Sequence, residues 1–151
     1  MNLQALAETS ALLFRTCETV SRSLPGLPDN PASHNSELDG WILRVEIDSL
    51  AHILSSLTVG FNSPALIACK ANRQYVGEPR YWTHIHQLMA DCSVVFQNMK
   101  QGFLAEKKGH FKGGFGRQAA VPTSPFLVRF RKAQIAAYCQ TMELSLDLLE
   151  M

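Results

Sequence analysis

The stretch from Phe126 to Leu149 constrains the fold of this chain more than any other, because its apolar residues recur at helical spacing. Intervals of three and four residues place one set of side chains on a single side of a helix: Leu127, Phe130, Gln134, Ile135, Tyr138, Met142, Ser145, Leu146 and Leu149. The residues between them are mainly polar and suit a solvated face: Arg129, Arg131, Lys132, Gln140, Glu143 and Asp147. The pattern predicts an amphipathic helix that packs in a bundle.

The first half of the chain contains three further helical patterns. They are predicted to span residues 3–24, 36–59 and 64–72. Ser36 opens the second helix, with Asp39 three residues later in a capping-box arrangement, and Gly60 is expected to end it in the left-handed conformation. Ser63 and Pro64 supply a cap and a first turn for the short third helix. Residues 25–36 hold three prolines and are expected to be a linker.

The second half contains one long helix before the last one. Pro79 opens this fourth helix, which is predicted to end near Phe103. Residues 106–124 are rich in glycine and lysine and are predicted to be a flexible loop, after which Ser124 and Pro125 begin the final helix. No convincing alternating strand pattern and no internal repeat is present. The predicted fold class is therefore all-α, an antiparallel bundle of four long helices and one short helix.

Length and charge limit the classes of protein that the chain can belong to. Its 151 residues suit one domain, residues 1–151, and a formal net charge of +1 gives no overall attraction to nucleic acid. The opening residues lack a basic region and contain Glu8, which argues against a signal peptide, and no apolar run reaches the roughly 18 residues of a membrane span. We expect a cytoplasmic protein that binds no nucleic acid, with peripheral membrane attachment as an alternative.

The residues that most often carry chemistry show no active-site pattern. Cys17, Cys69, Cys92 and Cys139 form no C-x-x-C pair, so we expect reduced, buried thiols. His84 and His86 are two residues apart and point in different directions on a helix. No Glu-x-x-His or His-x-x-x-His spacing and no nucleophile motif is present. The sequence therefore predicts no catalytic residue, no metal ligand, no cofactor and no enzymatic activity.

One set of basic residues is a candidate anionic-surface patch. Lys107, Lys108, Lys112 and Arg117 alternate with Phe111 and Phe115 in the Gly/Lys-rich loop. Lys100, Arg129, Arg131 and Lys132 extend this set. Such a patch can bind anionic lipid, whereas a solvated linker with ordinary basic residues is the simpler interpretation and is favoured by the near-neutral total charge.

Two segments resemble the N-terminal domain of fungal STAND (NOD-like receptor) proteins. The segment from Arg80 to Met99 carries the tryptophan and the acidic-cysteine pair of that family. The segment from Gln134 to Leu149 carries its I-x-x-Y-x-x-T-M-x-x-S-L phrase. The family-like core residues are Trp82, Cys92, Ile135, Tyr138, Met142 and Leu146.

The resemblance implies a HeLo-like helical bundle with a role in non-self recognition or regulated cell death. We therefore expect a non-enzymatic signalling or adaptor domain that self-associates or docks a protein partner through helix contacts. One alternative is a membrane-associating cell-death module. A small-ligand-binding bundle or an uncharacterised enzyme is the other.

Overall fold

The computed structural model describes residues 2–24, 36–72, 78–111 and 125–150, except for the side chains of 36–39, 102–111 and 125–128. Five helices make up this part of the chain, and it contains no strand. They are α1 (Leu3–Ser23), α2 (Ser36–Phe61), α3 (Pro64–Ala71), α4 (Pro79–Phe111) and α5 (Pro125–Glu150). The predicted all-α class, with four long helices and one short helix, is confirmed.

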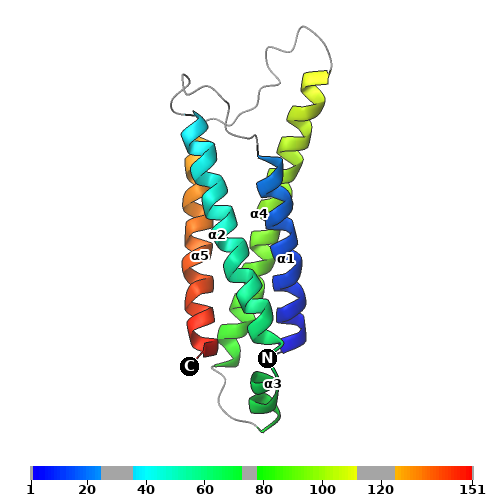
Figure 1. The fold of residues 1–151 in the computed structure, drawn as a ribbon, viewed down its shortest axis with the longest axis vertical. Helices are drawn as coiled ribbons and strands as arrows, with labels where there is room; N and C mark the ends of the chain where they lie inside the picture. The colour runs from blue at the N-terminus through cyan, green and yellow to red at the C-terminus, as the bar shows by residue number, and fades with distance from the viewer. Residues whose placement is uncertain (1, 25–35, 73–77, 112–124, 151) are drawn as a thin grey trace.

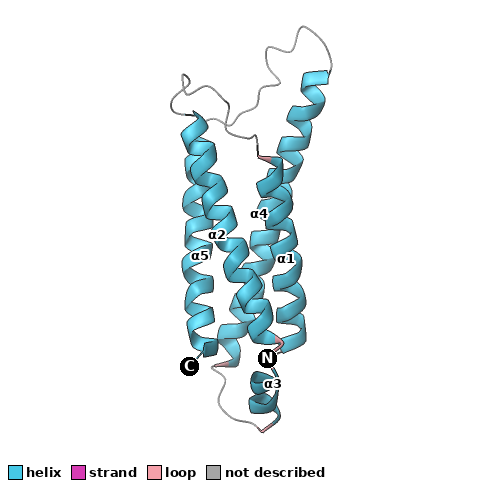
Figure 2. Ribbon diagram, viewed as in Figure 1, coloured by secondary structure: helices cyan, strands magenta, loops and turns pink. Residues whose placement is uncertain are grey.

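The four long helices run side by side, and successive long helices point in opposite directions (Figures 1 and 2). α2 packs extensively against α1 and α5, and α1 also packs against α4. Among the adjacent long helices, the backbones of α4 and α5 approach each other least, so the seam between them is the loosest in the bundle. α3 extends beyond the end of the bundle where the described chain begins and finishes (Figure 1).

Two helices begin at caps that the structure shows directly. The side chain of Ser63 accepts a hydrogen bond from the backbone N–H of Leu66 at 3.1 Å, and Pro64 occupies the first turn of α3, as predicted. The side chain of Asn2 caps α1 by accepting from the N–H of Ala5 at 3.2 Å. α2 begins at Ser36, as predicted, but the expected contact with Asp39 lies outside the described side chains.

Side chains from all five helices form one hydrophobic core. Fully buried members include Leu13, Ile47, Leu54, Met89, Phe96, Ile135 and Met142. Near the α3 end, the ring of Trp82 stands edge-on to the ring of Phe61, with centroids 5.6 Å apart, and to that of Tyr81 at 5.1 Å. Edge-to-face aromatic pairs add to the burial of apolar area, so this end of the core is rigidly packed.

Hydrogen bonds between side chains fix how the helices align. The pairs are Ser10–Thr58 at 2.8 Å and Ser21–Asp48 between α1 and α2, Thr9–His86 at 2.9 Å between α1 and α4, and Tyr81–Ser145 at 2.8 Å between α4 and α5. Ser10, Ser21 and Ser145 are buried. Burying a hydroxyl without a hydrogen-bond partner costs free energy. If one helix slid along its neighbour, these hydroxyls would lose their hydrogen bonds and would still be shielded from water.

The prediction that α4 ends near Phe103 is wrong, because the helix continues to Phe111. The extension contains Leu104, Ala105, Glu106, Lys107 and Lys108, which all favour helix, and Gly109 alone does not offset them. The predicted loop at 106–124 therefore overlaps α4 in its first residues. Residues 112–124, like 25–35 of the predicted linker, lie outside the described chain.

Gly60 does not end α2 as a left-handed cap. The helix continues to Phe61, and the backbone at Gly60 does not have a positive φ. A Cβ at this position would lie 3.1 Å from Cδ1 of Leu149 on α5, so the glycine allows a close approach between the two helices.

Candidate functional site

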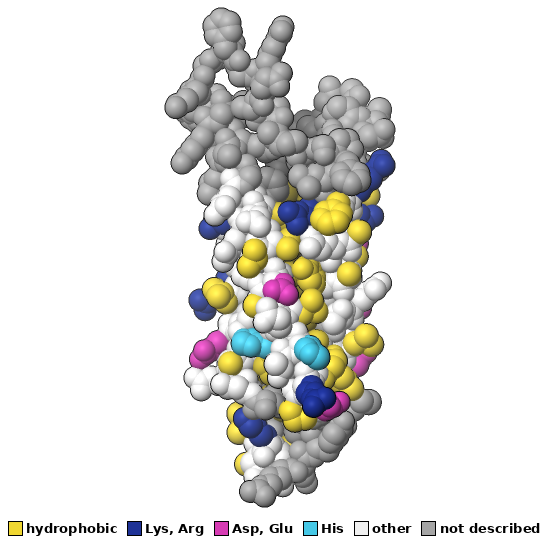
Figure 3. All heavy atoms as spheres, turned by 180° about the vertical axis from the view of Figure 1, so that it is seen from behind, with side chains coloured by type: hydrophobic (Ala, Val, Ile, Leu, Met, Phe, Trp, Pro, Cys, Tyr) yellow, Lys and Arg dark blue, Asp and Glu magenta, His cyan; other side chains and the backbone are white. Residues whose placement is uncertain are grey.

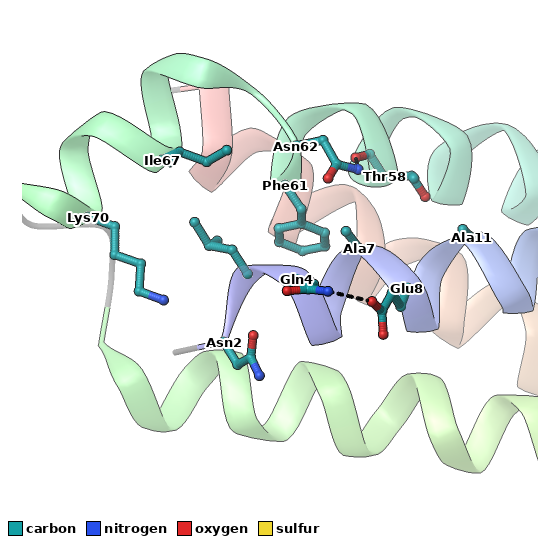
Figure 4. A pocket seen from close by; sticks show the side chains of 11 residues that line it. Asn2, Gln4, Ala7, Glu8, Ala11, Thr58, Phe61, Asn62, Ile67 and Lys70 are labelled. Atoms are coloured by element: carbon teal, nitrogen blue, oxygen red, sulfur yellow. Dashed lines mark hydrogen bonds between the residues drawn. The ribbon is translucent and has the colours of Figure 1, made fainter.

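One cavity lies between the beginning of α1, the end of α2 and α3, with a volume of about 670 Å³. Leu3, Phe61 and Ile67 give its wall an apolar part, and polar side chains lie on either side of Phe61 and Ile67 (Figure 4). Gln4 donates a hydrogen bond to Glu8 at 2.9 Å on one side, and Lys70 lies on the other (Figure 4). Its polar residues are exposed except Thr58, which is half-buried and bonded to Ser10, so the cavity offers no free buried group to recognise a ligand.

A second hollow of about 460 Å³ follows the groove between α2 and α5. It is lined by Val45, Asp48, Ser49, His52, Ile53 and Glu143. Asp48 is already engaged, because it accepts a hydrogen bond from Ser21 and lies 4.0 Å from Arg44. The groove is therefore an open surface between two packed helices, with apolar and polar residues mixed in its lining.

Three of the four cysteines are buried in the core, as predicted, and Cys69 is half-buried. Burial raises the pKa of Cys17 to about 12, with a smaller contribution from Cys139, and raises the pKa of Cys92 further still. Burial also raises the pKa of Cys139 to about 12, helped by Glu46 and Glu143, and its thiol donates to the carbonyl oxygen of Glu46 at 3.6 Å. Thiols of this kind are protonated at neutral pH and are poor nucleophiles.

The two histidines of the H-x-H motif have different surroundings. His86 forms a hydrogen bond with Thr9 of α1 at 2.9 Å, and His84 is exposed. Among the described residues, no group of three or more histidine, cysteine, aspartate or glutamate side chains is arranged to hold a metal ion.

The structure brings together only part of the predicted basic patch. Arg129, Arg131 and Lys132 lie near the beginning of α5, where Arg131 donates to Gln134 at 2.9 Å and stands 5.8 Å from the ring centroid of Phe130. The side chains of Lys107 and Lys108 lie outside the described part, as do Lys112 and Arg117 altogether. Their place beside the α5 cations stays a prediction.

The family-like residues are core residues. Trp82, Cys92, Ile135, Tyr138 and Met142 are buried, and Leu146 packs against the core from a half-buried position. The pKa of Tyr138 is raised, mainly by burial and also by Cys92 and Asp91. A hydrogen bond with Gln134 and the charge of Arg131 act in the opposite direction but do not cancel this rise. These side chains hold the bundle together and present no reactive group to solvent.

The outward side of α5 carries three large apolar side chains that are exposed. Phe130, Leu144 and Leu148 have exposed fractions of 52%, 62% and 42%. They belong to a line of exposed residues spaced three or four apart, which we call the outer stripe of α5: Phe130, Ala133, Ala137, Gln140, Leu144 and Leu148. α4 and α5 lie behind α1 and α2 in Figure 1, and the reverse view shows hydrophobic side chains running along this side (Figure 3).

The charged residues of α5 are segregated along its length. The basic ones are Arg129, Arg131 and Lys132, and the acidic ones are Glu143, Asp147 and Glu150. The ten residues from Ala133 to Met142 carry no charge. No acidic residue stands in the first turn and no basic residue in the last, so this order opposes the helix dipole rather than complementing it.

Sequence periodicity missed the outer stripe. It placed Phe130 on the buried side of the last helix, whereas half of this side chain is exposed. The order of charges along the helix is visible in the sequence, and it is the signal from which a surface site on α5 can be found.

Within the described residues, no single helix combines the length and the hydropathy needed to cross a bilayer. The part of α2 from Gly40 to Phe61 and α3 pass this test only as a pair, and they are bent by 50° relative to each other. In comparisons with protein-family models, curated proteins and solved structures, none matches the chain.

Proposed function

We propose that this chain is a non-enzymatic signalling or adaptor domain that acts through helix-to-helix contacts. The observation that carries the proposal is the outer stripe of α5, where Phe130, Leu144 and Leu148 are exposed on a helix whose other side forms the core. Large apolar side chains aligned on one exposed helix face are typical of protein-interaction surfaces. The outer stripe is thus the site that we expect a protein to cover.

Two further observations support this proposal. The three buried thiols have raised pKa values, which makes them unsuited to nucleophilic chemistry. The resemblance of the segments around Trp82 and Tyr138 to the N-terminal domains of fungal NOD-like receptors implies the same class of function, in non-self recognition or regulated cell death.

The proposal is tested by photo-crosslinking in cells that make the full chain. A photoreactive amino acid replaces Leu144, which is 62% exposed, and in a matched control it replaces Leu12 on α1, which is 60% exposed. The proposal is supported if the chain with the photoreactive residue at position 144 forms discrete crosslinked products with a protein and the chain with it at position 12 does not. The crosslinked protein can be a second copy of the chain or another protein. The same adducts from both positions, or none from either, contradict it.

A membrane-associating module is the second candidate, and one observation favours it. Phe130 is exposed beside Arg129, Arg131 and Lys132, and an aromatic ring among cations can bind at the surface of an anionic bilayer. Co-sedimentation with phosphatidylserine vesicles that is lost in F130S, and absent with neutral vesicles, supports this candidate. Equal recovery in the supernatant with both kinds of vesicle contradicts it.

A further inference from the structure

We infer that the protein covering the outer stripe of α5 is a second copy of this chain, with its own α5 packed antiparallel to the first. This inference rests on the proposed function and names the partner. The contact has two-fold symmetry, and the axis passes beside Ala137 and Gln140, near the middle of the exposed part of α5.

The argument begins with the charge order of α5. The basic residues lie near the beginning of α5 and the acidic ones near its end, where Asp147 and Glu150 stand in the last turn and are disfavoured by the helix dipole. Against an identical helix that runs the other way, the same order becomes favourable, because each basic end then meets an acidic end. The two helix dipoles are antiparallel in that arrangement as well.

The spacing of the charges fits this pairing residue by residue. A two-fold axis at position 138 places Arg129 opposite Asp147 of the second copy, and Lys132 opposite its Glu143. Arg129 and Asp147 are 18 residues apart (147 − 129), or five helical turns, so they lie on the same edge of α5. A two-fold axis perpendicular to both helices brings this edge of one α5 beside the same edge of the other α5. Because the helices run in opposite directions, the beginning of one edge then meets the end of the other.

The apolar residues of the outer stripe follow the same symmetry. Leu144 lies opposite Ala133 of the second copy, and Phe130 lies near its Leu148. Ala137 and Gln140 face each other across the axis, where the small alanine side chains allow two helices to approach closely. The large apolar side chains of the stripe thus lie toward its two ends, away from Ala137 at the axis.

The pattern fits a second copy better than it fits a membrane. An anionic bilayer attracts Arg129 and Lys132, but Glu143, Asp147 and Glu150 on the other half of the helix are repelled by it. A helix whose two halves carry opposite charges is self-complementary in charge, as a two-fold dimer requires. Charge pairs of this kind set the orientation, while the apolar stripe supplies the affinity.

Charge-reversal variants of the full chain test the inference by light scattering or sedimentation. The wild-type chain is expected to show a dimer whose fraction rises with concentration. R129E/K132E and E143K/D147K each place like charges in contact at both ends, so each is expected to weaken association at least about tenfold. An equimolar mixture of the two variants is expected to form a heterodimer, because every contact is again between opposite charges.

A chain that carries all four substitutions separates antiparallel from parallel pairing. Antiparallel packing restores every charge pair in that chain, so it dimerises again, whereas parallel packing leaves like charges facing each other. The reversals also improve the match of α5 to its dipole, so each variant is expected to keep its helical circular dichroism and unfolding midpoint. Loss of the dimer therefore reports on the contact and not on the fold.

Two results overturn the inference. One is a wild-type chain that stays monomeric at every accessible concentration, and the other is a wild-type dimer unchanged by R129E/K132E. If the chain is monomeric but position 144 still forms adducts with another protein, the proposed function stands and only the identity of the partner is wrong. If the chain is monomeric and position 144 forms no adduct, both proposals fail.

Discussion

The hydroxyl oxygen of Tyr81 on α4 lies 2.8 Å from that of Ser145 on α5, across the seam where the two helices are loosest. Ser145 is buried and donates its own proton to the carbonyl oxygen of Thr141 at 2.9 Å. The proton between the two hydroxyls therefore belongs to Tyr81, which donates to Ser145. This bond gives the seam a fixed alignment that apolar contacts alone do not provide.

Tyr81→Phe is expected to lower the free energy of unfolding by about 0.5–1.5 kcal/mol, the usual worth of one such hydrogen bond. The ring and its edge-on contact with Trp82 remain, so packing does not change. Urea denaturation of the two proteins measures the difference. Ser145→Ala and the double variant complete a double-mutant cycle. If the bond exists, the free energy of unfolding falls less in the double variant than the sum of its decreases in the two single variants. Strict additivity of the two single effects contradicts the assigned bond.

Two glycines within α2 are expected to respond differently to alanine. A Cβ added at Gly40 would have nothing within 4 Å, so Gly40→Ala gains helix propensity and raises stability by about 0.5–1 kcal/mol. At Gly60, the new methyl group meets Cδ1 of Leu149 at 3.1 Å, so part of the same gain is lost when that side chain moves.

Thermal or urea unfolding of both variants ranks the two effects, and the Leu149→Ala background provides the control. In that background, the two alanine substitutions are expected to give equal gains. A larger gain at Gly60 than at Gly40 in the wild-type background is the outcome that the structure does not allow.

The four thiols are expected to react at two very different rates with a disulfide reagent. Cys69 is half-buried on α3 and is accessible in the native protein, whereas Cys17, Cys92 and Cys139 are buried and protonated. At pH 8, one thiol should react quickly, and the other three only as fast as the protein opens. Cys69→Ser should remove the fast phase, and a fast phase of more than one thiol would show that the core is open.

The core of the bundle could be predicted from sequence, because burial around a helix follows a period that the apolar residues record. Ile135, Tyr138 and Met142 fall on that period and are buried. Periodicity treats every turn alike, however, and it does not show how closely the neighbouring helices cover each turn. Steps of three and four residues can also lead from one side of a helix to another, so Phe130 fits the spacing and yet lies on the exposed outer stripe of α5, whereas Ile135 and Met142 are buried.

Other features depend on contacts between segments that are distant in sequence. Glycine is an ordinary sign of a helix end, and only the presence of Leu149 on another helix reveals why Gly60 lies inside α2. Ser10, Ser21 and Ser145 have the polarity of surface residues, yet each is buried because a partner on a neighbouring helix meets its hydroxyl. The outer stripe of α5 required knowing which face of that helix the core leaves uncovered, whereas the order of its charges is visible in the sequence.

Alkaline pH is expected to destabilise the fold through its buried thiols. The pKa of Cys17 is raised to about 12 and that of Cys92 is higher, whereas an unfolded thiol titrates near about 8.5. Below about pH 8 both states hold these protons, so stability does not change; above about pH 9 only the unfolded chain releases them, and the free energy of unfolding falls. Cys139, whose pKa is also raised to about 12, responds in the same way, and each of the three thiols contributes up to about 1.4 kcal/mol per pH unit until its folded pKa is reached. Urea midpoints at pH 8, 9 and 10 measure this slope, and the Cys17→Ala/Cys92→Ala variant should show a much shallower one, whatever its stability at pH 8. The same slope in both proteins would mean that these thiols are exposed to solvent in the folded state.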